Sequence, residues 1–153
     1  MVNKNNDKIH KVVVILPYVK NKVLMQLRDL KSGISFPGQW GFFGGSITEG
    51  ETPDDCAKRE LFEEIGYKPD VIHKLSTDTL KMPSLGNTTI HSYCCQLRVP
   101  LKDIELNAWL YFGLFSIEEV ITGKLYSSRV KRVYPVIKNP YVINTIKNLF
   151  EYA

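Results

Sequence analysis

Three glutamates lie close together in the segment Arg59-Glu60-Leu61-Phe62-Glu63-Glu64, and they are the residues best suited to chemistry. On a helix, Glu60, Glu63 and Glu64 occupy positions i, i+3 and i+4 and therefore share one face. Three neighbouring carboxylates repel one another, so a helix gains from them only when cations neutralise them. Magnesium and manganese prefer such oxygen ligands, and Mg²⁺ also binds substrate phosphates. Taken alone, these residues suit a solvated acidic surface at least as well.

The residues upstream of this segment favour the metal site. Gly44-Gly45 precede it on a loop where backbone can approach a ligand closely. The spacing over residues 45–67 is Gly45, five residues, Glu51, seven residues, Arg59-Glu60-Leu61, one residue, Glu63-Glu64, one residue, Gly66, Tyr67. This spacing resembles the signature of the Nudix hydrolase family at every fixed position, with Tyr67 where the family usually has an aliphatic residue. A match of this length is poorly explained by chance. A helix that is only a solvated acidic surface does not account for the full spacing either.

The resemblance implies a Mg²⁺ or Mn²⁺ site built from oxygen ligands. The expected ligands are the carbonyl of Gly44 and the carboxylates of Glu51, Glu60, Glu63 and Glu64. Glu51 has an alternative role as the partner of Arg59, which would hold the carboxylate cluster in place without touching the substrate. The implied catalytic residues are Arg59, Glu60, Glu63 and Glu64. Glu60 is one candidate for the general base, and the loop residue Glu105 is the other, because parts of the family use a glutamate from a distant loop.

Such a site would hydrolyse a pyrophosphate bond. Bound metals neutralise the phosphates, and a metal-bound water attacks one phosphorus after a carboxylate takes its proton. The expected substrate is a nucleoside diphosphate linked to another moiety, either a nucleotide sugar such as ADP-ribose or a modified nucleoside triphosphate. The alternative is a regulatory module that binds such a nucleotide without turning it over, since one fold carries many functions. A module of that kind would be expected to lose carboxylates, and all of them are present here.

Three residues are candidates for contact with the substrate: Arg28, Phe43 and Glu105. Arg28 ends a predicted strand and is placed to reach a phosphate, although exposed arginines at strand ends are common. Phe43 belongs to a group of aromatic residues suited to stacking a base, together with Trp40, Phe42 and Trp109. Side chains alternate between the two faces of a strand, so at least one of Phe42 and Phe43 must lie in the core. For Glu105, a loop carboxylate in water is the alternative.

The elements that position these residues begin with two strands, residues 11–17 and 23–28, which predict a hairpin. The glutamates lie on a helix expected over residues 53–65. Thr52 suits its N-cap, Pro53 its first position and Gly66 the position after its end. Further strands are expected at residues 71–82, 88–99 and 109–115, a short helix at 116–122 and a C-terminal helix at 140–152.

Strands mixed with a few helices predict a layered α/β (α+β) protein. The length of 153 residues suits one compact domain, residues 1–153. Hydrophobic residues make up 44% and charged residues 24%, which excludes disordered, collagen-like and coiled-coil chains. The resemblance adds a more specific expectation, an α/β/α sandwich around a mixed β-sheet.

Charge and composition indicate the partners. The net charge of +4 favours an anionic small molecule, here the nucleoside diphosphate derivative, and no nucleic-acid-binding motif accompanies it. No apolar run approaches the roughly 20 residues that span a bilayer, so no membrane partner is expected. The chain starts without a signal-peptide pattern, and its three cysteines have no disulfide or metal spacing. We therefore expect a cytoplasmic protein, either a monomer or a homodimer.

Overall fold

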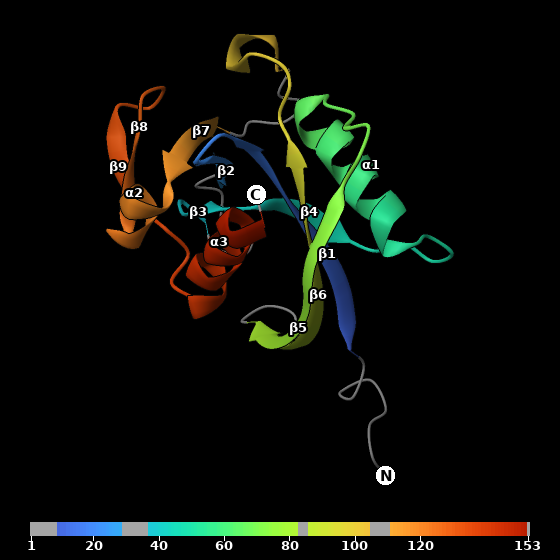
Figure 1. The fold of residues 1–153 in the computed structure, drawn as a ribbon. Coiled ribbons are helices and arrows are strands. Elements are labelled where there is room, and N and C mark those ends of the chain that lie inside the picture. Colours follow the sequence, from blue (N-terminus) through green and yellow to red (C-terminus); the bar gives the residue numbers. More distant parts are fainter. Residues whose placement is uncertain (1–8, 29–36, 83–85, 105–110, 153) are drawn as a thin grey trace.

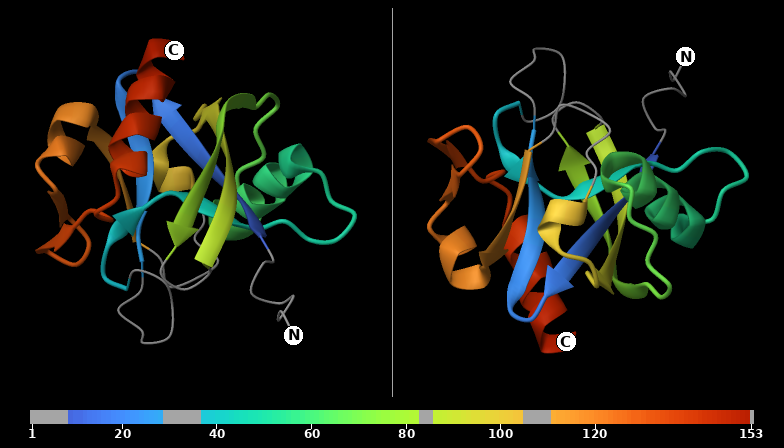
Figure 2. Two further views of the ribbon diagram at one scale, coloured as in Figure 1. Left: turned by 90° about the horizontal axis from the view of Figure 1, so that it is seen from below. Right: turned by 90° about the horizontal axis from the view of Figure 1, so that it is seen from above.

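The structure is a computed structural model that describes residues 9–28, 37–82, 86–104 and 111–152. A mixed β-sheet forms the middle layer, with helices against both of its faces (Figure 1). Helix α1, Pro53–Ile65, covers one face, and helix α3, Pro140–Tyr152, lies on the other side (Figure 2). One apolar core lies between the sheet and each helix. The predicted α/β/α sandwich with a mixed sheet is confirmed.

Strand β1, His10–Val19, is the centre of the sheet and has two partners along one edge. Its end forms the predicted antiparallel hairpin with β2, Lys22–Leu27. Its middle pairs instead with β4, Phe43–Ser46, also antiparallel. Along its other edge β1 runs parallel to β6, Gly86–Gln96, which pairs with β5, His73–Met82. The parallel pair beside antiparallel ones makes the sheet mixed.

Strand β2 extends the sheet further by pairing with two more strands. One is β7, Tyr111–Ser116, and the other is the short β3, Trp40–Gly41. β3 and β4 follow each other directly and are interrupted only at Phe42. The chain therefore changes its partner from β2 to β1 at this residue, close to the paired glycines.

Helix α1 has the boundaries predicted from its capping residues. The hydroxyl of Thr52 accepts a hydrogen bond from the amide of Asp55 at 3.1 Å, and Gly66 ends the helix with a φ of 71°, which suits glycine. The buried side chains of the helix are those of Cys56, Ala57, Leu61 and Ile65. They pack on the sheet at β1 and β4, so this contact carries the acidic residues of the helix to the edge of β4.

The remaining elements follow the prediction except for a short 3₁₀-helix, Leu101–Asp103, and one hairpin. Helix α2, Ile117–Ile121, begins with the expected capping box of Ser116 and Glu119. Strands β8, Lys124–Ser127, and β9, Arg132–Pro135, form a hairpin that the sequence did not predict. Its turn, residues 128–131, contains two basic residues and no glycine or Asn-Gly pair, so the usual hairpin signal is missing. None of the helices in the described residues is long and apolar enough to cross a membrane.

Candidate active site

Helix α1 places two carboxylates directly against β4. Glu64 accepts a hydrogen bond from the amide of Gly44 at 3.2 Å. A Cβ atom at Gly45 would collide with the carboxylate of Glu60, and one at Gly44 would collide with the carbonyl oxygen of Val13 on β1. At Gly44 only a residue without a Cβ lets β4 lie this close to β1, whereas a Cβ at Gly45 would displace the carboxylate of Glu60. The paired glycines therefore create the space in which Glu60 and Glu64 meet the backbone.

Arg59 connects the other carboxylates of the site. Its Nε and Nη2 atoms donate to the two oxygens of Glu51 at 2.6 and 2.9 Å, and its Nη1 donates to Glu60 and Glu63, both at 3.1 Å. Of the two roles predicted for Glu51, the structure shows the pairing with Arg59, and its role as a metal ligand stays a prediction. A planar guanidinium with five donors can hold three carboxylates at once, which an ammonium group cannot do with the same geometry.

The environments of the carboxylates drive their pKa values apart. Burial, and then the nearby charge of Glu60, raise the pKa of Glu64 to about 8. Burial also raises the pKa of Glu60, against the opposing effect of Arg59. The hydrogen bonds from Arg59 lower the pKa of Glu51 to about 2. The folded protein thus disfavours ionisation of the two carboxylates nearest the glycines, whereas it favours ionisation of Glu51.

This set of donors fits a hard divalent cation. The available atoms are carboxylate and main-chain oxygens, the ligands that Mg²⁺ and Mn²⁺ prefer, and a cation would stabilise the ionised form of Glu64. Within the described residues, no three acidic, histidine or cysteine side chains already form a complete metal cage. Glu60 and Glu63 are instead turned toward Arg59. A metal ion would therefore need to draw Glu60 or Glu63 partly away from Arg59, and the carbonyl of Gly44 as a ligand stays a prediction.

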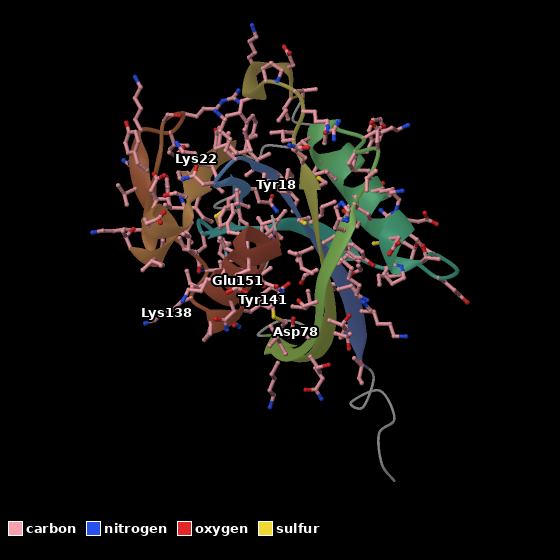
Figure 3. The ribbon with its side chains drawn as sticks, viewed as in Figure 1. Tyr18, Lys22, Asp78, Lys138, Tyr141 and Glu151 are labelled. Atoms are coloured by element: carbon pink, nitrogen blue, oxygen red, sulfur yellow. The ribbon has the colours of Figure 1, made fainter. Side chains whose placement is uncertain are left out.

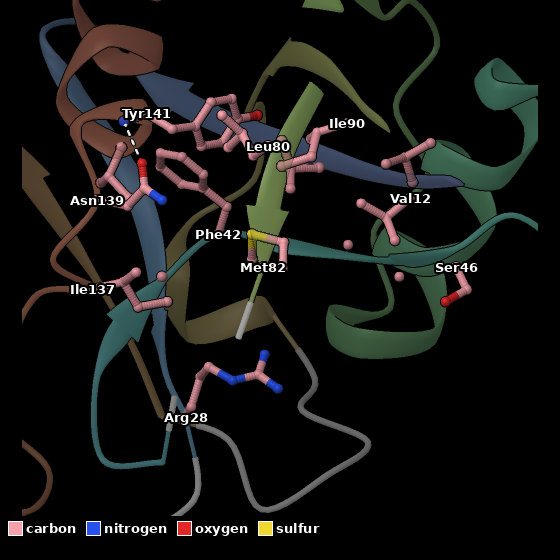
Figure 4. A pocket seen from close by; sticks show the side chains of 16 residues that line it. Val12, Arg28, Phe42, Ser46, Leu80, Met82, Ile90, Ile137, Asn139 and Tyr141 are labelled. Atoms are coloured by element: carbon pink, nitrogen blue, oxygen red, sulfur yellow. Dashed lines mark hydrogen bonds between the residues drawn. The ribbon is translucent and has the colours of Figure 1, made fainter. Parts of the chain in front are cut away.

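A cavity of about 250 Å³ opens beside the paired glycines. Its walls come from β1, β5 and β6 and from the start of α3, and they are mostly apolar (Figure 4). The rings of Phe42 and Tyr141 meet edge to face in it, with their centroids 6.3 Å apart. Arg28 also lines the cavity; burial lowers its pKa, and the charge of Glu64 acts in the opposite direction. The cavity therefore joins an aromatic, apolar wall to the charged group of Arg28 and to the paired glycines, whose backbone contacts Glu60 and Glu64.

The prediction that Phe43 contacts the substrate is wrong. Its side chain is fully buried between the sheet and α1, opposite Ile15, because it alternates with Phe42 on the two faces of the sheet. Phe42 faces the cavity instead. Trp40 is buried too: its ring packs against Phe115, and its Nε1 donates to the carbonyl of Leu125 at 3.1 Å. Trp40 is therefore a core residue and not a platform for a base.

Several residues of the cavity were not singled out from the sequence, among them Leu80, Met82, Asn139 and Tyr141. They come from β5 and from the start of α3, far along the chain from the glycines. Asn139-Pro140 did carry a signal, because asparagine before proline suits an N-cap and the first helical position. The Oδ1 atom of Asn139 accepts a hydrogen bond from the amide of Tyr141 at 2.9 Å, as an N-cap does. The other candidates Glu105 and Trp109 lie outside the described residues.

A second, polar cavity lies next to the first. Tyr141 of α3 and Asp78 of β5 lie close together at its boundary (Figure 3). The hydroxyl of Tyr141 forms a hydrogen bond with Ser92, and burial raises its pKa to about 12. Tyr141 is therefore neutral at physiological pH and contributes a ring and a bound hydroxyl to the wall of the main cavity.

Comparison with known proteins gives a family match and two curated relatives. The sequence model of the NUDIX domain matches residues 8–122. The chain is 34% identical to the oxidized purine nucleoside triphosphate hydrolase of Mus musculus over 91 residues, which cover 58% of the chain and 55% of that protein. It is also 34% identical over 79 residues to the protein of the same name from Danio rerio, covering 52% of the chain and 46% of that protein. The chain spans about half the length of these curated relatives.

A solved structure with a similar fold is the NUDIX domain of Shewanella oneidensis NrtR complexed with ADP ribose. The two share a TM-score of 0.70 at 20% sequence identity, over 99% of this chain and 93% of that domain. At this level of identity, the similarity concerns the fold alone.

Proposed function

The chain belongs to the Nudix family, and we propose that it is a metal-dependent pyrophosphohydrolase acting on a nucleoside triphosphate, in particular one with a modified purine base. One observation carries this proposal: an apolar cavity with an aromatic wall opens beside the paired glycines, whose backbone contacts Glu60 and Glu64. A nucleoside triphosphate has this combination of a flat, apolar base and a charged tail. The names of the mouse and zebrafish relatives support the choice of a purine triphosphate over a nucleotide sugar.

The charged end of the cavity would take the phosphates. A bound Mg²⁺ or Mn²⁺ would neutralise them and lower the pKa of a water molecule. Glu63 and Glu64 would hold the metal ions, with Arg59 keeping Glu63 near its working position, and Glu60 is left for proton transfer. Arg28 lines the same cavity within electrostatic range of Glu64, so it is placed to bind a phosphate oxygen.

Glu60 is the general base in this proposal. It lies against Gly45 at the mouth of the site, and burial raises its pKa, which makes its carboxylate a better proton acceptor near neutral pH. Arg59 donates to one oxygen of Glu60, which orients the group. The oxygen of the attacking water would form a bond to phosphorus as its proton passes to Glu60, and the bond between phosphorus and the leaving phosphate oxygen would break.

The apolar end would bind the base. Phe42 and Tyr141 offer aromatic surface for contact with a flat ring. Because Oδ1 of Asn139 is engaged by the amide of Tyr141, its Nδ2 is the amide atom turned toward the ring of Phe42 and the cavity (Figure 4). This amide would donate a hydrogen bond to a carbonyl oxygen of the base, as guanine and oxidised purines carry. The site therefore favours a keto purine.

The test is hydrolysis of a substrate panel with Mg²⁺ or Mn²⁺, beside the variant Glu64→Gln. The panel contains the ordinary nucleoside triphosphates, oxidised dGTP, ADP-ribose, nucleotide sugars and dinucleoside polyphosphates. We expect metal-dependent release of pyrophosphate and a nucleoside monophosphate, with the oxidised purine giving the highest kcat/KM and Glu64→Gln giving almost no turnover.

Other outcomes would redirect the assignment. A highest kcat/KM for ADP-ribose would move the substrate class to nucleotide sugars. Absence of turnover on every compound, together with a raised melting temperature in their presence, would refute the enzyme and favour a regulatory module that binds nucleotides.

A further inference from the structure

A buried glutamine lies beneath the candidate site and has no place in the roles described so far. Gln26, on β2, exposes 1% of its surface. Its Nε2 donates to the carbonyl of Phe42 at 2.6 Å, and its Oε1 is buried without a hydrogen-bond partner in the described part of the chain. A carbonyl facing this amide requires the nitrogen on that side, so the oxygen is the atom left without a partner.

The bond lies at the point where the chain changes its partner strand. The backbone of Gln26 pairs with Gly41 of β3, and its side chain reaches the carbonyl of the next residue, Phe42. From Phe43 onward the chain pairs with β1 instead of β2. Gln26 therefore binds Phe42, the one residue between the segment paired with β2 and the segment paired with β1.

This position is adjacent to two parts of the site. On one side of the break the ring of Phe42 faces the cavity, while Phe43 enters the core under α1. Two residues further on, the amide of Gly44 donates to Glu64. Rotation of the peptide after Phe42 would change the direction of its ring and shift the glycine backbone that lies against the carboxylates.

The unpaired Oε1 of Gln26 should reduce the stability of the folded protein. A buried acceptor without a partner destabilises the folded protein, and an apolar side chain of similar shape would remove that penalty together with the bond. Natural proteins keep destabilising groups chiefly at functional sites. Together with the geometry, this points to a use for Gln26 in the site.

We propose that Gln26 is a positioning residue for substrate binding. By holding the carbonyl of Phe42, it keeps the ring of Phe42 facing the cavity and the amide of Gly44 facing Glu64. The proposal rests on the function proposed above, because it assigns Phe42 to the base. It identifies a residue that the Nudix signature does not contain.

The test compares Gln26→Met, which keeps the length of the side chain and removes both polar atoms, with the control Met25→Leu. Met25 precedes Gln26 on β2, and its side chain is fully buried in the core on the other face of the sheet. For Gln26→Met we expect KM for the best substrate to rise about tenfold with kcat changed less than about threefold, which corresponds to lost binding and not lost chemistry. The melting temperature should stay the same or rise. Met25→Leu should change neither kinetic constant.

A purely structural role predicts the opposite pattern. A lower melting temperature of Gln26→Met with an unchanged KM would overturn the proposal. The proposal would also fail if Gln26→Met had the same melting temperature and the same KM as the wild type. Gln26→Leu provides a second apolar variant should Gln26→Met fold poorly.

Hydrogen exchange separates failure of this proposal from failure of the proposed function. If the wild type turns over no substrate, the proposed function fails, and the amide exchange rates of residues 42–46 then decide the role of Gln26. Exchange about tenfold faster in Gln26→Met than in the wild type would support the positioning role. Exchange equal to that of the wild type would refute it.

Discussion

Phe42 and Phe43 are neighbours of the same type on opposite faces of the sheet, so truncating each should have a different effect. Phe43 is fully buried beneath α1, and removal of a buried phenylalanine ring costs about 3–5 kcal/mol. In a protein of this size each kcal/mol lowers the melting temperature by about 2–4 °C. Phe43→Ala should therefore lower the melting temperature by about 6–20 °C.

Phe42 is only partly buried and lines the cavity, so Phe42→Ala should act mainly on substrate binding. Loss of one aromatic contact with a base corresponds to about 1–3 kcal/mol, or an increase in KM of about 5- to 150-fold. Its melting temperature should fall by only a few degrees.

Two measurements check this pair: thermal unfolding followed by circular dichroism, and initial rates at several concentrations of the best substrate, taken at a temperature where both variants are folded. The expected result is a large loss of stability with little change in KM for Phe43→Ala, and the reverse for Phe42→Ala. If Phe43→Ala raised KM without loss of stability, the assignment of the two rings to core and cavity would be refuted.

Three further variants test other contacts. Asn139→Asp retains an N-cap acceptor but lacks the amide donor, so its melting temperature should equal that of the wild type. In steady-state assays its KM for keto purines should rise about tenfold, and an unchanged KM would show that Asn139 does not recognise the base. Arg59→Lys keeps the charge but cannot hold three carboxylates, so kcat/KM should fall about 10- to 100-fold, and activity near that of the wild type would refute the bridging role. In the absence of metal ions, the pKa of Glu64 is raised because the folded state disfavours its ionised form. The free energy of unfolding of the wild type should therefore fall relative to that of Glu64→Gln as the pH rises from about 4.5 to about 8. Melting curves across this range measure the difference, which a constant gap between the two proteins would contradict.

Much of the carboxylate site could be predicted from the sequence because its geometry is local. The capping residues Thr52 and Gly66 define a helix, and the helical repeat then places Glu60 and Glu64 one turn apart on the same side. The interaction of Arg59 with Glu51, one of the two roles expected for Glu51, spans only eight residues. Interactions over such short separations depend little on how the rest of the chain packs.

The wrong prediction at Phe43 has a different origin. The alternation of side chains along a strand showed that Phe42 and Phe43 face opposite ways, but not which of the two faces the core. That choice follows from the register of β4 on β1, in which Phe43 lies opposite Ile15. The register depends on the packing of α1 against the same face, and no short stretch of sequence contains that information.

The sequence by itself therefore determined the acidic helix, its ends and the family to which it belongs, because capping, helical repeat and motif spacing act between residues close together in the chain. Only the tertiary structure decided what surrounds that helix: the cavity formed by β5, β6 and the start of α3, the orientation of Phe42, and the contact from Gln26 to its carbonyl. These features depend on strand pairing and helix packing between distant segments, where small differences in register decide which side chain meets the ligand and which enters the core.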